Sequence, residues 1–143
     1  MHLESATRFL ALGSVTGGIL SVTLLPAHAD LFAGNAGRHP FSLSDFLSNA
    51  RYADVMDVAQ NVILFLPFGF FFATVLPIRL SENRRRAWTC AAGLCVSAGV
   101  EILQAWIPGR YSALSDVLLN GCGAFLGGVL AARLARNGYG PDD

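Results

Sequence analysis

Residues 58–75 read VAQNVILFLPFGFFFATV, eighteen consecutive positions without a charged side chain. Crossing the hydrocarbon core of a bilayer takes about 20 apolar residues, because an α-helix rises only about 1.5 Å per residue. Backbone N–H and C=O groups find no water in lipid, so a spanning segment of this kind must be helical. We therefore predict a transmembrane helix here, extending toward Ile78.

Three further apolar runs accompany this one, at residues 9–25, 87–106 and 114–134. Of the 143 residues, 53% are hydrophobic and only 14% are charged, whereas about a quarter of the residues in soluble domains are charged. The sequence therefore predicts an all-α membrane protein, a single bundle of four transmembrane helices.

The first apolar run has two interpretations. Ala27-His28-Ala29 resembles a signal-peptidase site, and Pro26 suits the end of a cleaved segment. Against cleavage, the run exceeds the roughly 7–15 apolar residues of a signal peptide, and Glu4 lies in the segment that precedes it. A retained helix is favoured. The alternative is a cleaved signal, which would leave three spans.

Arginine placement predicts the orientation. The chain has no lysine, and four spans place residues 1–8, 79–86 and 135–143 on one side. That side and the adjoining helix ends hold seven of the ten arginines, which are Arg8, Arg79, Arg84, Arg85, Arg86, Arg133 and Arg136. By the positive-inside rule both termini are cytoplasmic, and Arg84–Arg86 is interpreted as a topology signal. Residues 26–57 are then an outer loop of a protein in a bacterial inner membrane. Apolar residues at helical spacing over 43–50 indicate a short amphipathic helix, which either lies on the outer membrane face or caps the bundle.

Composition argues against several other functions. A formal net charge of zero does not suit nucleic acid, whose phosphates require a basic surface. His2, His28 and His39 have no acidic or thiol partners at metal-ligand spacing, and the three cysteines lie in apolar runs. We expect no metal and no cofactor.

Polar side chains gather toward the outer ends of the three C-terminal spans. A carboxylate or amide in hydrocarbon is costly, so such a cluster indicates a functional site. We predict an outward-facing polar pocket whose candidate ligand-binding residues are Asp57, Gln60, Asn61, Glu101, Gln104, Arg110, Asp116 and Asn120.

Small residues lie deeper in the bundle on the same helix faces as these polar residues, and we call each such row along a helix face a stripe. The stripe of Glu101 includes Gly93 and Ser97, and the stripe of Asp116 includes Gly123 and Gly127. Glycine lets helix backbones approach closely, so we predict a tight contact between the third and fourth helices. Pro67 predicts a kink in the second helix, and residues 108–109 predict a turn.

The ordered polar motifs resemble those of the VanZ-like membrane proteins. The similar segments are DVAQNVILFLPFG at 57–69, EILQ at 101–104, PGR at 108–110, Asp116, NGCG at 120–123 and HPF at 39–41. The resemblance covers about residues 40–130, with a core of three spans over 58–134. It implies a small helical envelope protein from a family whose founding member is associated with teicoplanin resistance, and it brings no settled biochemical activity.

Three functions remain open. The favoured one is binding of an envelope lipid or lipid-linked ligand, with Arg110 at the pocket mouth because its planar donors suit phosphate or carboxylate. The second is a transferase or hydrolase in which Glu101 and Asp116 are the catalytic candidates. The third is a purely structural bundle. The expected partners are membrane lipids and the lipid-linked ligand, and the sequence does not determine the oligomeric state.

Overall fold

A computed structural model describes residues 2–24, 55–107 and 113–137, which form four helices. They are α1 (His2–Leu24), α3 (Val55–Val75), α4 (Glu82–Gln104) and α5 (Leu114–Asn137). Each is long and apolar enough to cross a membrane, and the described residues contain no strand. The predicted all-α architecture with four candidate membrane helices is confirmed.

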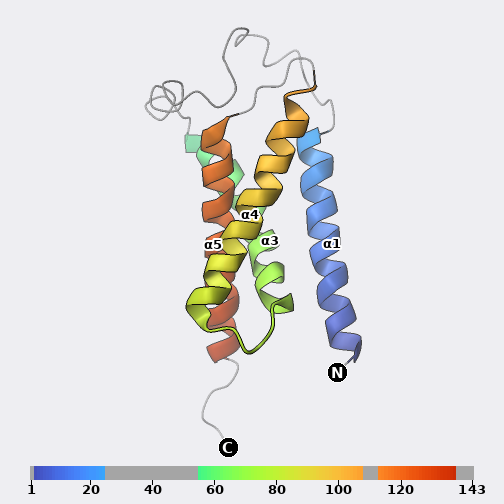
Figure 1. The fold of residues 1–143 in the computed structure, drawn as a ribbon, viewed down its shortest axis with the longest axis vertical. Coiled ribbons are helices and arrows are strands. Elements are labelled where there is room, and N and C mark those ends of the chain that lie inside the picture. The colour runs from blue at the N-terminus through green and yellow to red at the C-terminus, as the bar shows by residue number, and fades with distance from the viewer. Residues whose placement is uncertain (1, 25–54, 108–112, 138–143) are drawn as a thin grey trace, which may run out of the picture.

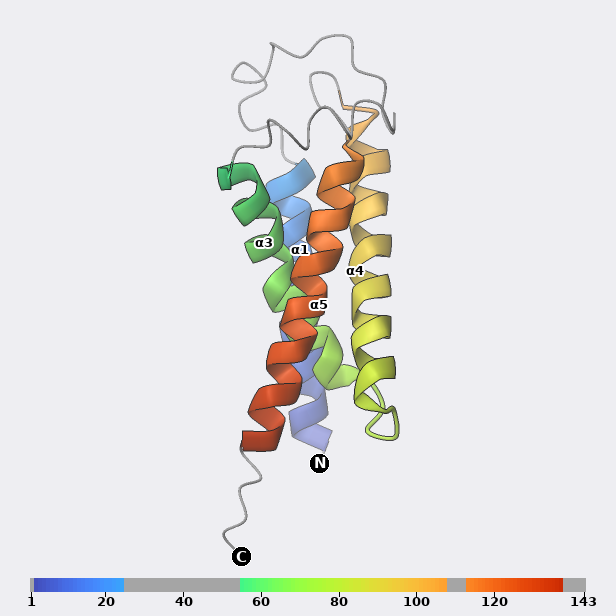
Figure 2. The same cartoon turned by 90° about the vertical axis from the view of Figure 1, so that its left-hand side faces the viewer.

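The helices alternate in direction, so the bundle has two distinct ends (Figures 1 and 2). The start of α1, the end of α3, the start of α4 and the end of α5 lie together at what we call the arginine-rich end. The end of α1, the start of α3, the end of α4 and the start of α5 lie together at what we call the Glu101 end. The interfacial helix predicted at 43–50 and the turn at 108–109 fall outside the described residues.

The helices extend beyond the apolar runs that predicted them. α1 begins at His2 rather than near Phe9, and α4 begins at Glu82, which places the whole arginine run inside its first turns. Polar residues outside the hydrocarbon can continue a helix because water satisfies its exposed groups. Pro67 lies within α3, which continues past it to Val75.

Helix α5 packs most closely against α3, through glycines whose backbones touch. A Cβ added to Gly127 would lie 2.6 Å from the backbone N of Phe70, and one added to Gly123 would lie 3.0 Å from the carbonyl carbon of Val62. Both glycines therefore face α3. We predicted that these two glycines would pack against the preceding helix, α4, so their partner differs from the prediction, although the predicted contact between α4 and α5 is present.

The contact between α5 and α4 uses the neighbouring positions instead. Ala124 is fully buried, and a Cβ added to Gly93 of α4 would collide with its side chain. On its other side Ala124 meets Gly69 of α3, where an added Cβ would lie 2.6 Å from the Cα of Ala124. Ala124 is thus the point at which α3, α4 and α5 meet.

Helix α1 completes the core from the side of α3. Ile19 is only 2% exposed and clusters with Phe65, Phe68 and Ala124. The Phe65 and Phe68 rings lie 5.9 Å apart in a tilted arrangement, which is favourable for aromatic pairs. Residues from α1, α3 and α5 therefore share one buried cluster.

Arg85 of α4 binds the end of α3. Its Nη1 donates hydrogen bonds to the carbonyls of Ala73 at 2.6 Å and Leu76 at 3.2 Å, and its Nη2 donates to that of Pro77 at 3.0 Å. The last four carbonyls of a helix have no partner within the helix. A cation there also interacts favourably with the helix dipole, so Arg85 of α4 caps α3.

Candidate functional site

Glu101 is a buried carboxylate near the end of α4. Its residue is 3% exposed, and its Oε2 accepts a hydrogen bond from the backbone N–H of Ala113 at 2.9 Å. Ala113 immediately precedes α5, and its carbonyl accepts the N–H of Asp116 at 3.1 Å. Within a single helix, a capping box uses a carboxylate in the first turn to bind this same backbone N–H. Here α4 supplies the carboxylate and caps α5.

Gln104 lies one turn further along α4 and caps a different helix. Its Nε2 donates to the carbonyl of Thr23 at 2.9 Å, one of the last four carbonyls of α1, which have no partner within that helix. Gln104 is 8% exposed. The hydrogen bond therefore ties the end of α1 to the bundle in the same layer as Glu101.

Asn120 and Ser97 connect α4 and α5 below this layer. The Nδ2 of Asn120 donates to the Oγ of Ser97 at 2.7 Å, and both residues are buried. The oxygen of the same amide, Asn120 Oδ1, is buried and has no hydrogen-bond partner among the described residues. Leaving a buried acceptor unpaired costs about 1–3 kcal/mol, so this oxygen is a place where a donor from outside the chain would be favourable.

Asp116 and Asn61 lie at the same end but are only partly buried. Asp116 is in the first turn of α5, where its negative charge suits the helix dipole, and its Oδ1 accepts a hydrogen bond from Ser115 Oγ at 3.3 Å. The backbone of Ala113 therefore donates its N–H to the Glu101 side chain, and its carbonyl accepts the backbone N–H of Asp116.

Of the three remaining predicted site residues, only Gln60 has a described side chain. Gln60 is exposed on α3, while its neighbour Asn61 is partly buried, so the two point to different surroundings. Asp57 lies in the first turn of α3, but its side chain is outside the described ones. Arg110 lies outside the described residues.

Sequence reasoning missed the backbone partners of this site. Thr23 and Ala113 contribute a carbonyl and an N–H, groups that every residue except proline carries, so no side-chain pattern identifies them. Among the described residues, no group of three His, Cys, Asp or Glu side chains could hold a metal ion.

These features define a class: a polytopic helical membrane protein with buried carboxylate and amide side chains at one end of its bundle. The sequence model of the VanZ/LLP1 family matches residues 13–136, so the chain belongs to this family. The match includes the second half of α1 and is wider than residues 40–130, the stretch over which the motifs indicated the resemblance. The chain has no significant match among the curated proteins or the solved structures.

Proposed function

We propose that the Glu101 end of the bundle binds the polar headgroup of an envelope lipid or of a lipid-linked envelope ligand. One observation carries the proposal: a carboxylate, Glu101, is buried inside a candidate membrane span. Ionisable residues in such segments are rare, and they face protein or water-filled cavities where they serve a function.

The chemistry of the described groups indicates what part of a headgroup they suit. A carboxylate has two oxygens with about four acceptor sites, and Asn120 Oδ1 is a buried acceptor to which no described residue donates. Acceptors of this kind suit donors such as saccharide hydroxyls. Arg110 would bind a phosphate, because its planar donors match the phosphate oxygens. That part of the proposal rests on the sequence.

The proposed location follows from the same arrangement. The arginine-rich end would face the cytoplasm by the positive-inside rule, which would place the Glu101 end at the outer leaflet of a bacterial inner membrane. Envelope lipids and lipid-linked saccharides present their headgroups there, so the ligand and the site would lie at the same depth.

A purely structural role is the second candidate, and specific hydrogen bonds favour it. Glu101 caps α5, Gln104 caps α1, and Asn120 joins Ser97. If these bonds are the whole role of the polar residues, a substitution that preserves them should change nothing. Glu101→Gln is such a substitution, because its amide oxygen can still accept the N–H of Ala113.

The deciding experiment is lipid mass spectrometry on full-length protein purified in mild detergent. We compare wild type, Glu101→Gln and the matched control Glu82→Gln, which neutralises an exposed glutamate at the arginine-rich end. The proposal expects a co-purifying lipid or lipid-linked species that Glu101→Gln loses and Glu82→Gln keeps, with all three proteins folded. Identical lipid content in all three proteins would support the structural role instead.

The same preparations test the enzyme alternative. A catalytic role for Glu101 expects conversion of a lipid-linked substrate by the wild type, abolished in Glu101→Gln. Binding of the species without any change in its mass supports the binding role.

A further inference from the structure

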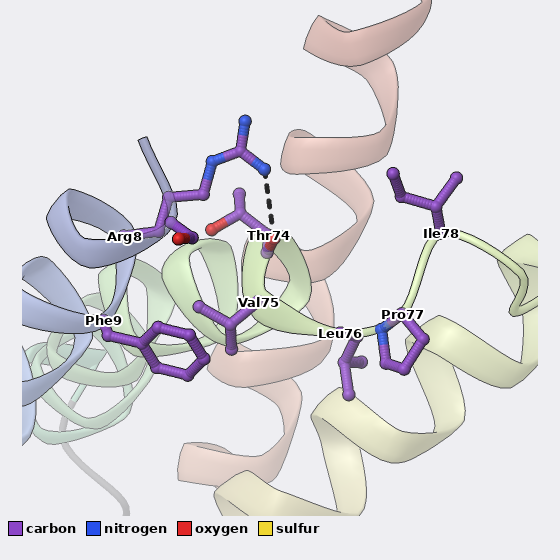
Figure 3. A pocket seen from close by; sticks show the side chains of 8 residues that line it. Arg8, Phe9, Thr74, Val75, Leu76, Pro77 and Ile78 are labelled. Carbon is purple, nitrogen blue, oxygen red and sulfur yellow. Dashed lines mark hydrogen bonds between the residues drawn. The ribbon is translucent and has the colours of Figure 1, made fainter. Parts of the chain in front are cut away.

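A pocket lies at the arginine-rich end, between the start of α1 and the end of α3 (Figure 3). Its volume is about 300 Å³, and its lining includes Arg8 and Phe9 of α1, Thr74 of α3, and Leu76 and Ile78 just beyond the end of α3. The candidate spans of these helices begin at Ser5 and end at Val75. The pocket is therefore at the depth where a membrane helix meets lipid headgroups.

The lining combines one guanidinium with apolar side chains. Nη1 of Arg8 donates a long hydrogen bond of 3.4 Å to the carbonyl of Thr74, drawn as the dashed line in Figure 3. A guanidinium has five donors, enough to bind a backbone carbonyl and a phosphate together. Phe9 is 60% exposed and Ile78 is 92% exposed, so apolar surface lies beside the cation.

The described residues at this end carry a net positive charge. They contain seven arginines and two glutamates, Glu4 and Glu82. Arg85 is engaged with the carbonyls that end α3, and Glu82 pairs with Arg86 at 2.9 Å and with Arg136 at 3.7 Å. Arg79 follows the pocket residue Ile78 directly and is exposed. The net charge favours an anion over a neutral or cationic occupant.

We propose that this pocket binds an anionic phospholipid of the leaflet at the arginine-rich end, with its phosphate at Arg8 and its acyl chains along the apolar surface at Phe9 and Ile78. Arginine suits phosphate through its planar donors, and basic pockets between helices on the cytoplasmic side of a membrane recognise anionic headgroups. A free phosphate would leave the exposed apolar side chains uncovered. The site is at the opposite end from Glu101, so it is independent of the proposed function.

Such a lipid would also stabilise the position of α1. The pocket is formed by α1 and α3 together, and the bond from Arg8 to Thr74 already joins them. A phosphate bound to Arg8 and acyl chains packed on both helices would add to the contact that Ile19 makes deeper in the bundle.

Native mass spectrometry of the full-length protein tests the proposal. Detergent-purified protein is offered equal amounts of phosphatidylglycerol and phosphatidylcholine, which differ in headgroup charge. We expect a preference for phosphatidylglycerol that Arg8→Gln reduces about fivefold, the factor that one arginine contributes near an anionic surface. The control Arg84→Gln removes an exposed arginine at the same end that does not line the pocket, and it should retain most of the preference.

Three results would overturn the proposal. These are equal retention of both lipids by wild type, an equal loss in Arg84→Gln, and displacement of the lipid by excess glycerol 3-phosphate, which would indicate a free phosphate ligand. Because Arg8 is exposed, Arg8→Gln should fold normally. Arg8→Lys provides a second check, since it keeps the charge and should bind more phosphatidylglycerol than Arg8→Gln.

Discussion

The carboxylate of Glu101 lies 2.9 Å from the backbone N of Ala113, so a side chain of α4 caps the start of α5. The same helix caps both other helices, since Gln104 binds the end of α1 and Arg85 binds the end of α3. Helix ends carry backbone groups without partners, and lipid supplies none. Helix α4 thus provides hydrogen-bond partners for backbone groups at one end of every other described helix. Its polar residues therefore have a structural role in addition to any ligand binding.

Glu101→Leu should destabilise the bundle more than Glu101→Gln. Leucine removes the acceptor and leaves the N–H of Ala113 unpaired, at a cost of about 1–3 kcal/mol. Glutamine retains an acceptor of similar reach, so Glu101→Gln should lose less stability than Glu101→Leu. Thermal unfolding in a single detergent measures both variants, and equal stability of Glu101→Leu and wild type would show that the cap contributes little.

Arg85→Gln should lower the free energy of unfolding by about 1.5–3 kcal/mol, the range for hydrogen bonds that involve a charged group. The reason is that Arg85 binds three carbonyls at and beyond the end of α3. Arg84→Gln is the matched control, because Arg84 is exposed and surface substitutions change stability by only about 0.5 kcal/mol. Similar losses in both variants would mean that charge at this end matters more than the cap.

Gly127→Ala should destabilise the packing of α5 on α3. The added Cβ would meet the backbone of Leu66 and Phe70, which cannot move aside as a side chain can, and overpacking costs about 1–3 kcal/mol. Gly99→Ala is the control, since an added Cβ there has nothing within 4 Å and alanine favours a helix by about 1 kcal/mol. The two variants should therefore shift the unfolding temperature in opposite directions.

The sequence predicted the spans well because the cost of polar groups in lipid leaves few alternatives. It also predicted Glu101, Gln104 and Asn120 as candidate site residues, and all three are buried. It could not predict their partners, because two of them are backbone groups of Thr23 and Ala113 that become available only when helices end beside each other.

The packing partner of the glycines was unpredictable for a related reason. Successive helix positions differ by about 100°, so Gly123 and Ala124 face different neighbours although both lie close to the stripe of Asn120. Gly123 faces α3, whereas Ala124 lies between α3 and α4. A helical stripe shows which residues share a face, and only the fold shows that α5 has helices on both sides of it.

The last prediction concerns whether α1 is an integral part of the bundle or a removable signal. Ile19 is 2% exposed within the shared core cluster, so Ile19→Ala should lower the free energy of unfolding by about 2–4 kcal/mol. Val22 is also on α1 but is 65% exposed, and Val22→Ala should change stability by only about 0.5 kcal/mol. Unfolding of the purified variants measures the difference, and mass spectrometry of the N-terminal peptide checks that α1 is present. Loss of residues 1–29 from the mature protein, or equal stability of the two variants, would show that the three remaining helices form the bundle without α1.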